Sequence, residues 1–186
     1  MKLLRTEYQK EIQTKNKSNL IFIDETGVDL SMSRYYGRAP SSDRVYDHVP
    51  YKDGKRKNII GGLSLKGLVS FFTTEETVSG DLFLNYVENI LCPVLSPNDI
   101  VVMDNLPSHK VDGVEEAINS KGAELLYLSP YSPDFSPIEP CWSKLKNNLR
   151  KLKARSPELL DDGIKESLEE ITLSDCDGWF RHCGIS

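Results

Sequence analysis

The sequence predicts a layered α/β domain built on a mixed sheet. Two short apolar runs, residues 19–23 and 99–103, are too continuous for half-exposed strands and are typical of buried central ones. Residues 80–91 and 141–153 instead repeat their apolar side chains at helical spacing. Strands come first and then alternate with helices, which is the order of a layered domain with one sheet.

The first half of the chain is expected to form the antiparallel part of this sheet. Residues 31–38 and 44–49 place Tyr, Val and Arg between turn residues and predict a weak hairpin or an edge. An Asp-Gly pair at 53–54 predicts a tight turn. Residues 58–65 and 68–72 flank a Lys-Gly pair and predict a second hairpin.

The second half should add the parallel strands and the covering helices. Residues 111–120 are expected to be helical, with Gly122 placed to end the helix, and residues 124–128 to form a strand. The segment SPYSPDFSPIEP that follows is too rich in proline for a helix or a central strand. Residues 157–171 predict a second helix after the one at 141–153.

Composition agrees with one folded, soluble domain. The chain has 186 residues, of which 39% are hydrophobic and 27% charged, and this is ordinary for a globular protein. No apolar run approaches the ~20 residues that cross a bilayer, and the polar N-terminus has no signal-peptide core. We therefore expect an intracellular protein without a membrane segment. Its four cysteines form no C-x-x-C pair and are expected to be reduced thiols.

Charge is distributed unevenly along the chain. The net charge is -5, and residues 58–140 carry three basic side chains against twelve acidic ones. Residues 34–57 hold seven basic side chains against three acidic, and residues 141–155 hold six basic and no acidic ones. An acidic centre flanked by basic segments suits a polyanion held beside a cation-binding site. For either basic segment, a merely solvated surface is the alternative.

Three carboxylates stand at the ends of predicted elements. Asp24 and Asp104 each end a buried strand, and Glu139 lies where the proline-rich loop enters the basic helix. If the two strands are parallel neighbours, both aspartates lie at one carboxyl edge of the sheet. Three such groups would repel one another, and Mg²⁺ prefers hard oxygen ligands of this kind. Two ions ~4 Å apart would serve an in-line phosphoryl displacement.

Each carboxylate also has a purely structural interpretation. An aspartate after a strand is often a turn or cap residue. The segment Ser136-Pro137-Ile138-Glu139 matches a capping box, in which Glu139 would bond back to the amide of Ser136. Pro140 disturbs that register because it removes an early helix donor. From the residues alone, both interpretations stay open.

Three segments resemble the catalytic motifs of the DDE transposases, and most of all those of the mariner superfamily on the side of its bacterial insertion-sequence transposases. They are FIDETG (22–27), VVMDNLPSHK (101–110) and YLSPYSPDFSPIEPCWSKLK (127–146). The interval between Asp104 and Glu139 is 34 residues (105–138), similar to the final interval in that superfamily. The resemblance covers roughly residues 19–155 and implies a ribonuclease H-like fold, an α/β mixed sheet flanked by helices.

By the same resemblance, the chain is expected to be the catalytic domain of a cut-and-paste DNA transposase. It would cleave phosphodiesters at element ends and transfer the 3′ hydroxyl to target DNA with two Mg²⁺ or Mn²⁺ ions. Asp24, Asp104 and Glu139 would be the catalytic and metal-binding triad. Glu25 follows the first aspartate, as in many relatives, but a strand would point it to the opposite face, so we do not expect it to be a ligand.

Further roles are expected around these motifs. Asn105 could orient Asp104 or a bound water, and His109 could contact phosphate. Trp142 is expected to be a core residue, because an aromatic on the apolar face of a helix usually packs. The residues of the basic helix that we expect to bind the DNA backbone are Lys144, Lys146 and Arg150.

The resemblance also bears on domains and partners. Relatives carry an N-terminal helix-turn-helix, whereas about eighteen polar residues precede the first strand here. We expect a polar extension or linker (1–18), a ribonuclease H-like DDE catalytic domain (19–155), and a C-terminal helix with an acidic tail (156–186). The expected partners are double-stranded DNA, a second copy in a homodimer and a separate or missing helix-turn-helix domain, in the cytoplasm at the bacterial nucleoid.

Two other functions compete with this one. A ribonuclease H-like nuclease or junction resolvase would also use carboxylates and two metals, but the run Ser-Pro-x-x-Ser-Pro-Ile-Glu-Pro favours a transposase. A non-catalytic, DNA-binding transposase remnant is the third possibility. The presence of all three acidic residues speaks against it.

Overall fold

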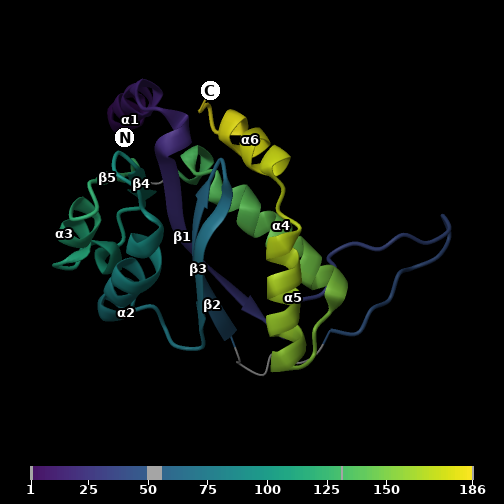
Figure 1. Cartoon of the computed structure of the whole chain (residues 1–186). Coiled ribbons are helices and arrows are strands. Elements are labelled where there is room, and N and C mark those ends of the chain that lie inside the picture. The colour runs from purple at the N-terminus through teal and green to yellow at the C-terminus, as the bar shows by residue number, and fades with distance from the viewer. Residues whose placement is uncertain (1, 50–55, 131, 186) are drawn as a thin grey trace.

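The computed structural model describes residues 2–49, 56–130 and 132–185. It holds a five-stranded sheet in the order β3-β2-β1-β4-β5, with helices on both faces (Figure 1). The strands are β1 (Leu20–Asp29), β2 (Arg56–Ser64), β3 (Gly67–Thr74), β4 (Ile100–Met103) and β5 (Glu124–Tyr127). The helices are α1 (Lys2–Thr14), α2 (Gly80–Tyr86), α3 (Val114–Asn119), α4 (Ile138–Leu152), α5 (Pro157–Glu169) and α6 (Leu173–His182).

Parallel and antiparallel pairing meet at β1. This strand pairs antiparallel with β2, which pairs antiparallel with β3. On its other edge β1 runs parallel to β4, and β4 runs parallel to β5. The predicted mixed sheet is thus confirmed. Phe22 lies opposite Val102, so Asp24 and Asp104, two residues further along each chain, emerge at the same edge.

Side chains of β1 alternate between two cores. Leu20 and Phe22 belong to the core beneath α4, α5 and α6, whereas Ile21 and Ile23 belong to the core beneath α2 and α3. A strand sends successive side chains to opposite faces. The same alternation therefore directs Asp24 toward the face that α4 covers and the next residue toward the other face.

Helix α4 begins earlier than the sequence predicts. The expected start was residue 141, but the helix begins at Ile138 and includes Pro140 in its first turn. Proline is tolerated there because the first amides of a helix have no partner within it. The helix ends at Leu152 and is capped by Lys153, which has a left-handed backbone with φ of 55°. Starting the helix at Ile138 places Glu139 in its first turn.

The predicted hairpin or edge over 31–38 and 44–49 is wrong. Residues 34–49, the arm, leave the body as an extended loop without a strand among its described residues (Figure 1). Tyr36 and Tyr46 are 90% and 83% exposed. The arm has strand-forming residues but lies beyond any neighbouring strand with which it could pair. The turn predicted at 53–54 lies outside the described residues.

At the N-terminus, where a polar extension or linker was expected, the chain forms helix α1. Tyr8 and Ile12 are buried in the core beneath α4, and the ring of Tyr8 stacks on Phe135 with 5.7 Å between ring centroids. The guanidinium of Arg5 donates to Ser132 Oγ at 2.8 Å. Tyr8 and Ile12 are the buried hydrophobic residues of α1, whereas Leu3 and Leu4 are exposed, so the helix has too short an apolar pattern to be predicted from the sequence.

The C-terminal residues fold as well. Residues 173–182, expected to be part of an acidic tail, form α6, whose start is closed by a capping box between Thr172 and Asp175. Cys176 and Phe180, four residues apart on α6, are fully buried. All four cysteines are free thiols. No helix in the described ranges is long and apolar enough to cross a membrane.

Gly61 allows α4 to approach the sheet, and this can be tested. Gly61 on β2 pairs with Asp24 on β1, and a Cβ at position 61 would lie 2.6 Å from the ring of Trp142. Because that ring is buried, Gly61→Ala should lower the free energy of unfolding by about 1–3 kcal/mol in urea denaturation. The control is Gly178→Ala in α6, where a Cβ meets nothing within 4 Å. Equal stability of both variants would contradict the assignment.

Candidate active site

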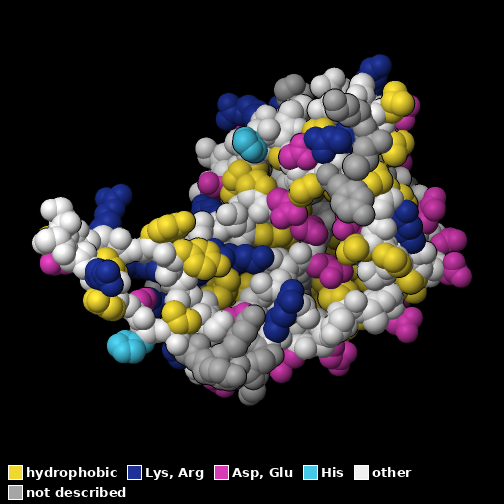
Figure 2. Space-filling model, turned by 180° about the vertical axis from the view of Figure 1, so that it is seen from behind, with side chains coloured by type: hydrophobic (Ala, Val, Ile, Leu, Met, Phe, Trp, Pro, Cys, Tyr) yellow, Lys and Arg dark blue, Asp and Glu magenta, His cyan; other side chains and the backbone are white. Residues whose placement is uncertain are grey.

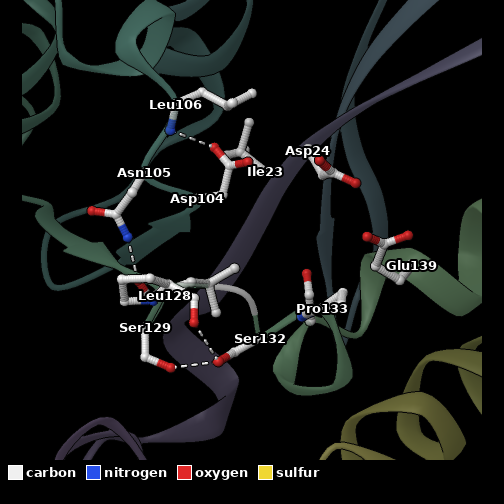
Figure 3. A pocket seen from close by; sticks show the side chains of 12 residues that line it. Ile23, Asp24, Asp104, Asn105, Leu106, Leu128, Ser129, Ser132, Pro133 and Glu139 are labelled. Carbon is white, nitrogen blue, oxygen red and sulfur yellow. Dashed lines mark hydrogen bonds between the residues drawn. The ribbon is translucent and has the colours of Figure 1, made fainter. Parts of the chain in front are cut away.

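A pocket of about 380 Å³ opens at the carboxyl end of β4 and beside the middle of β1, which continues past Asp24 to Asp29 although the sequence predicted that the strand ends at Asp24. Asp24 from β1, Asp104 after β4 and Glu139 from the first turn of α4 all line it (Figure 3). The loop before α4 forms the opposite wall with Ser132 and Pro133. The structure therefore brings together the three predicted carboxylates from three separate elements.

Glu139 faces the pocket and does not cap its helix. The N-cap of α4 is Pro137, and no side chain bonds to the end of the helix. The amide of Ser136 donates to the carbonyl of Pro133 at 3.0 Å. Figure 3 shows the carboxylate of Glu139 turned toward Asp24. The capping-box interpretation is therefore wrong.

Asp24 is in an environment that disfavours its charge. Burial raises the pKa of its carboxyl to about 7, and the charges of Glu139 and Asp104 add to the rise. The amide of Glu25 and the indole of Trp142 oppose it, and Nε1 of Trp142 donates to Oδ2 at 3.1 Å. A nearby cation would favour the ionised form of such a carboxyl.

Asp104 contacts groups within the chain that favour its ionised form. Burial alone would raise the pKa of Asp104, but contacts with His109 and the amide of Leu106 outweigh it and lower the pKa below its usual value. The amide of Leu106 donates to Oδ1 at 3.1 Å. Nδ1 of His109 lies 2.7 Å from the same oxygen, as an ion-pair contact outside hydrogen-bond geometry. The other oxygen of Asp104 points toward Asp24 (Figure 3).

His109 cannot contact phosphate, so that prediction is wrong. Its side chain is 0% exposed and stacks on Phe83 with 4.1 Å between ring centroids. Its Nε2 lies 3.1 Å from Oε1 of Glu25. Burial lowers the pKa of His109, but contacts with Asp104 and Glu25 outweigh burial and raise it to about 9. The imidazolium therefore serves two carboxylates of the protein.

Asn105 lines the pocket without bonding to Asp104. Its amide donates to the carbonyl of Leu128, and its Oδ1 accepts from Nζ of Lys110 at 2.7 Å. The bond to Leu128 joins the loop after β4 to the end of β5, and the bond from Lys110 lies within that loop. The expected role of orienting Asp104 falls instead to His109 and to the amide of Leu106.

The three basic residues proposed on α4 differ in their surroundings. Lys144 pairs with Asp175 at 2.6 Å and donates to the carbonyl of Glu170 at 2.7 Å, so it holds the corner between α5 and α6. Arg150 donates to Tyr35 at 3.0 Å and lies 4.4 Å from the centroid of its ring. Lys146 lines a groove between α4 and the base of the arm and makes no ion pair within the described ranges.

Two functional contacts were missed by sequence reasoning. Trp142 is buried as expected, but its indole also holds Asp24. The spacing of three residues from Glu139, which places both side chains on one side of α4, was the available signal. Glu25 was not expected to be a metal ligand because it points away from the pocket. On that opposite face its side chain contacts His109. No local pattern indicates that second contact.

The donor set fits a divalent cation, although the side chains are not arranged around one. Within residues 2–49, 56–130 and 132–185, no group of three or more His, Cys, Asp or Glu side chains could hold a metal ion as placed. The pocket nevertheless holds three carboxylates, with hydroxyl and amide groups and no His or Cys among its described lining residues, and such oxygen donors suit Mg²⁺ or Mn²⁺. The unfavourable burial of Asp24 gives a physical reason for a cation to bind there. Asp24, Asp104 and Glu139 are the residues that would hold it.

Solved structures with the same arrangement define the class of fold. The catalytic domain of Mos1 mariner transposase matches with a TM-score of 0.73 at 16% identity, over 98% of this chain and 84% of that one. The Mos1 transposase paired-end complex with left transposon end matches with a TM-score of 0.78 at 18% identity, over 98% of this chain. This chain spans 56% of the length of the latter. The fold is therefore ribonuclease H-like.

Sequence comparison gives the family. The family model described as DDE superfamily endonuclease matches residues 19–161, which include the whole sheet and all three pocket carboxylates. No curated protein matches the chain in sequence. The chain belongs to the DDE superfamily endonucleases.

The raised pKa of Asp24 predicts a pH-dependent stability. Between the usual pKa of 3.8 and about 7, the folded chain binds a proton at Asp24 that the unfolded chain has lost. Stability therefore falls as pH rises through this range, by about 1.4 kcal/mol for each unit of pKa difference. Asp24→Asn should lack this loss, so the metal-free variant should gain stability over the wild type between pH 5 and pH 8. Urea denaturation in EDTA measures it.

The matched control is Asp104→Asn. Asp104 has a lowered pKa and pairs with buried His109, so removing its charge should lower stability at pH 8 instead of raising it. Equal pH slopes in the wild type and in Asp24→Asn would show that Asp24 ionises normally.

Proposed function

We propose that the chain is the catalytic domain of a cut-and-paste DNA transposase, with Asp24, Asp104 and Glu139 as its catalytic and metal-binding carboxylates. The observation that carries the proposal is the pocket, in which carboxylates from β1, β4 and α4 converge. Membership of the DDE endonuclease family supports phosphodiester cleavage. Two of the similar Mos1 structures are a complex with transposon-end DNA and a strand transfer complex, and these support transposition.

The chemistry divides between the cations and the chain. Two bound Mg²⁺ or Mn²⁺ ions would polarise the attacking and leaving oxygens of the scissile phosphate. The chain holds the oxygens that bind them: the indole of Trp142 orients Asp24, and the amide of Leu106 orients Asp104. Ile23 and Leu128 in the pocket wall lower the local dielectric, which strengthens these electrostatic interactions.

The substrate in this proposal is double-stranded DNA that lies along α4. Lys146 is the phosphate contact on that helix, while Lys144 and Arg150 secure the α5–α6 corner and the arm. The arm carries further basic and hydrophobic side chains and projects from the body in Figure 2. The proposal includes a homodimeric transposition complex, a separate helix-turn-helix domain and a cytoplasmic location at the bacterial nucleoid. Its catalytic unit is residues 19–155, on which α1, α5 and α6 pack.

Charge removal at the triad tests the function directly. Asp24→Asn, Asp104→Asn and Glu139→Gln should each reduce divalent-dependent nicking of a labelled duplex by on the order of 10⁴-fold. The control is Glu76→Gln on the exposed loop after β3, which should cleave like the wild type. Cleavage that persists in the triad variants would refute the assignment. Cleavage without strand transfer would favour a nuclease or resolvase, and an inactive wild type would favour a remnant.

Lys144 and Lys146, two residues apart on α4, offer a matched pair for DNA binding. Lys146→Ala should weaken binding equally on all sequences and reduce the slope of log affinity against log salt by about one. Lys144→Ala should leave DNA affinity near that of the wild type and lower the melting temperature, because it frees the α5–α6 corner. Fluorescence anisotropy at several salt concentrations measures the affinities. Equal losses of affinity would show that the intramolecular partners of Lys144 do not restrain it.

A further inference from the structure

The parallel ladder between β1 and β4 stops short of the two aspartates. Its last pair is Phe22 with Val102. Beyond this point β1 continues alongside β2 as far as Asp29, whereas the chain after β4 leaves the sheet for the short 3₁₀ turn Pro107–Lys110. Pairing between these strands therefore does not by itself fix the separation of Asp24 and Asp104.

Two side chains bridge this gap. Oε1 of Glu25 lies 3.1 Å from Nε2 of His109, and Nδ1 of the same ring lies 2.7 Å from Oδ1 of Asp104. Glu25 is the neighbour of Asp24 on β1 and points to the opposite face. The contact therefore runs from the strand of one aspartate, behind the pocket, to the side chain of the other.

The bridge is built rigidly. The ring of His109 is fully buried and stacked on Phe83 of α2, and the hydroxyl of Tyr127 on β5 donates to the backbone carbonyl of His109 at 3.3 Å. Besides the two carboxylates, α2 thus supports the ring of His109 and β5 supports its backbone. Movement of Asp104 relative to β1 requires either this ring to move or its contacts to break.

We propose that Glu25 is a positioning residue for the cation-binding aspartates, and that it acts through His109. His109 and the amide of Leu106 both engage Oδ1 of Asp104, which leaves the other oxygen directed toward Asp24 (Figure 3). The proposal rests on the proposed function, because it assumes that Asp24 and Asp104 bind a divalent cation together. Loss of a group that orients a metal ligand typically costs 10–100-fold in metal affinity.

If Glu25 only stabilised the fold through its ion pair with His109, replacing Glu25 would have a different effect. Removing it would lower stability and leave the affinity for metal unchanged, since Glu25 lies on the far face of β1 and cannot reach the pocket. A control is Glu124→Ala on β5, because Glu124 makes an ion pair with Lys15 at 2.6 Å, more exposed than that of Glu25, and does not line the pocket. Comparing the two positions separates a general loss of an ion pair from a loss of positioning.

The experiment is a calorimetric titration of the DNA-free full chain with Mn²⁺, together with melting temperatures of the metal-free proteins. Glu25→Ala should raise the Kd for Mn²⁺ about 10-fold or more. Glu25→Gln keeps an oxygen that can accept from His109, so it should stay within about threefold of the wild type, as should Glu124→Ala. Glu25→Asp keeps the charge but is one methylene too short, and should resemble Glu25→Ala.

The outcomes are decisive in both directions. A folded Glu25→Ala that binds Mn²⁺ like the wild type would overturn the positioning role, and so would equal losses in Glu25→Ala and Glu124→Ala. If Glu25→Ala does not fold, wild-type affinity in Glu25→Asp overturns it instead. Asp24→Asn, titrated in parallel, tests separately whether the proposed cation site exists. Unchanged Mn²⁺ binding in that variant would remove the cation site itself and both proposals with it.

Discussion

The rest of the site depends on the constraint that the first part of β1 is buried on both faces, while the strand pairs with β4 over Leu20–Phe22 and with β2 from Phe22 onward. Such a strand must alternate its side chains between two cores, and it cannot slip by one residue without exchanging them. In this register Phe22 and Ile23 enter opposite cores. By the same alternation, Asp24 points to the side of Phe22 and contacts α4, and Glu25 points to the side of Ile23 and contacts the buried ring of His109. One strand thereby supplies the pocket carboxylate of Asp24 and, through Glu25 and His109, a contact that reaches Asp104.

The two aspartates at the sheet edge are electrostatically unlike. Asp24 is buried near two other acids, and its pKa is raised to about 7. Asp104 has a cationic partner in His109, and its pKa is lowered. In the absence of a cation the Asp24 carboxyl is thus only about half ionised near pH 7, while that of Asp104 stays ionised. This asymmetry reduces the negative charge that the three acids place in the pocket together.

The sequence was sufficient to predict a strand or helix where a strong local pattern coincided with burial. The runs that became β4 and the first part of β1 are continuously apolar, and each is followed by an aspartate. This predicted that Asp24 and Asp104 share an edge if the strands are parallel neighbours, but not that β1 continues to Asp29. The arm was mistaken for a hairpin because Tyr and Val favour strands, whereas a strand also needs a neighbour. Helix α1 was missed because only Tyr8 and Ile12 are buried, and two positions are too few to reveal a helical period. The burial of His109 depends on Phe83 and Glu25, which are distant in sequence, and no periodicity reports such a contact.

Helix α1 also has a bearing on where this protein can be cut. Arg5 lies 4.3 Å above the ring of Phe135 and bonds to Asp134 at 2.9 Å, so the helix clasps the proline-rich loop that forms one wall of the pocket. A fragment trimmed to the start of the family match at residue 19 would keep all five strands of the described sheet and all three pocket carboxylates. It would nevertheless expose Phe135 to water and release the loop beside Ser132. The first helix, remote from the acids in sequence, is in that sense part of the wall that encloses them.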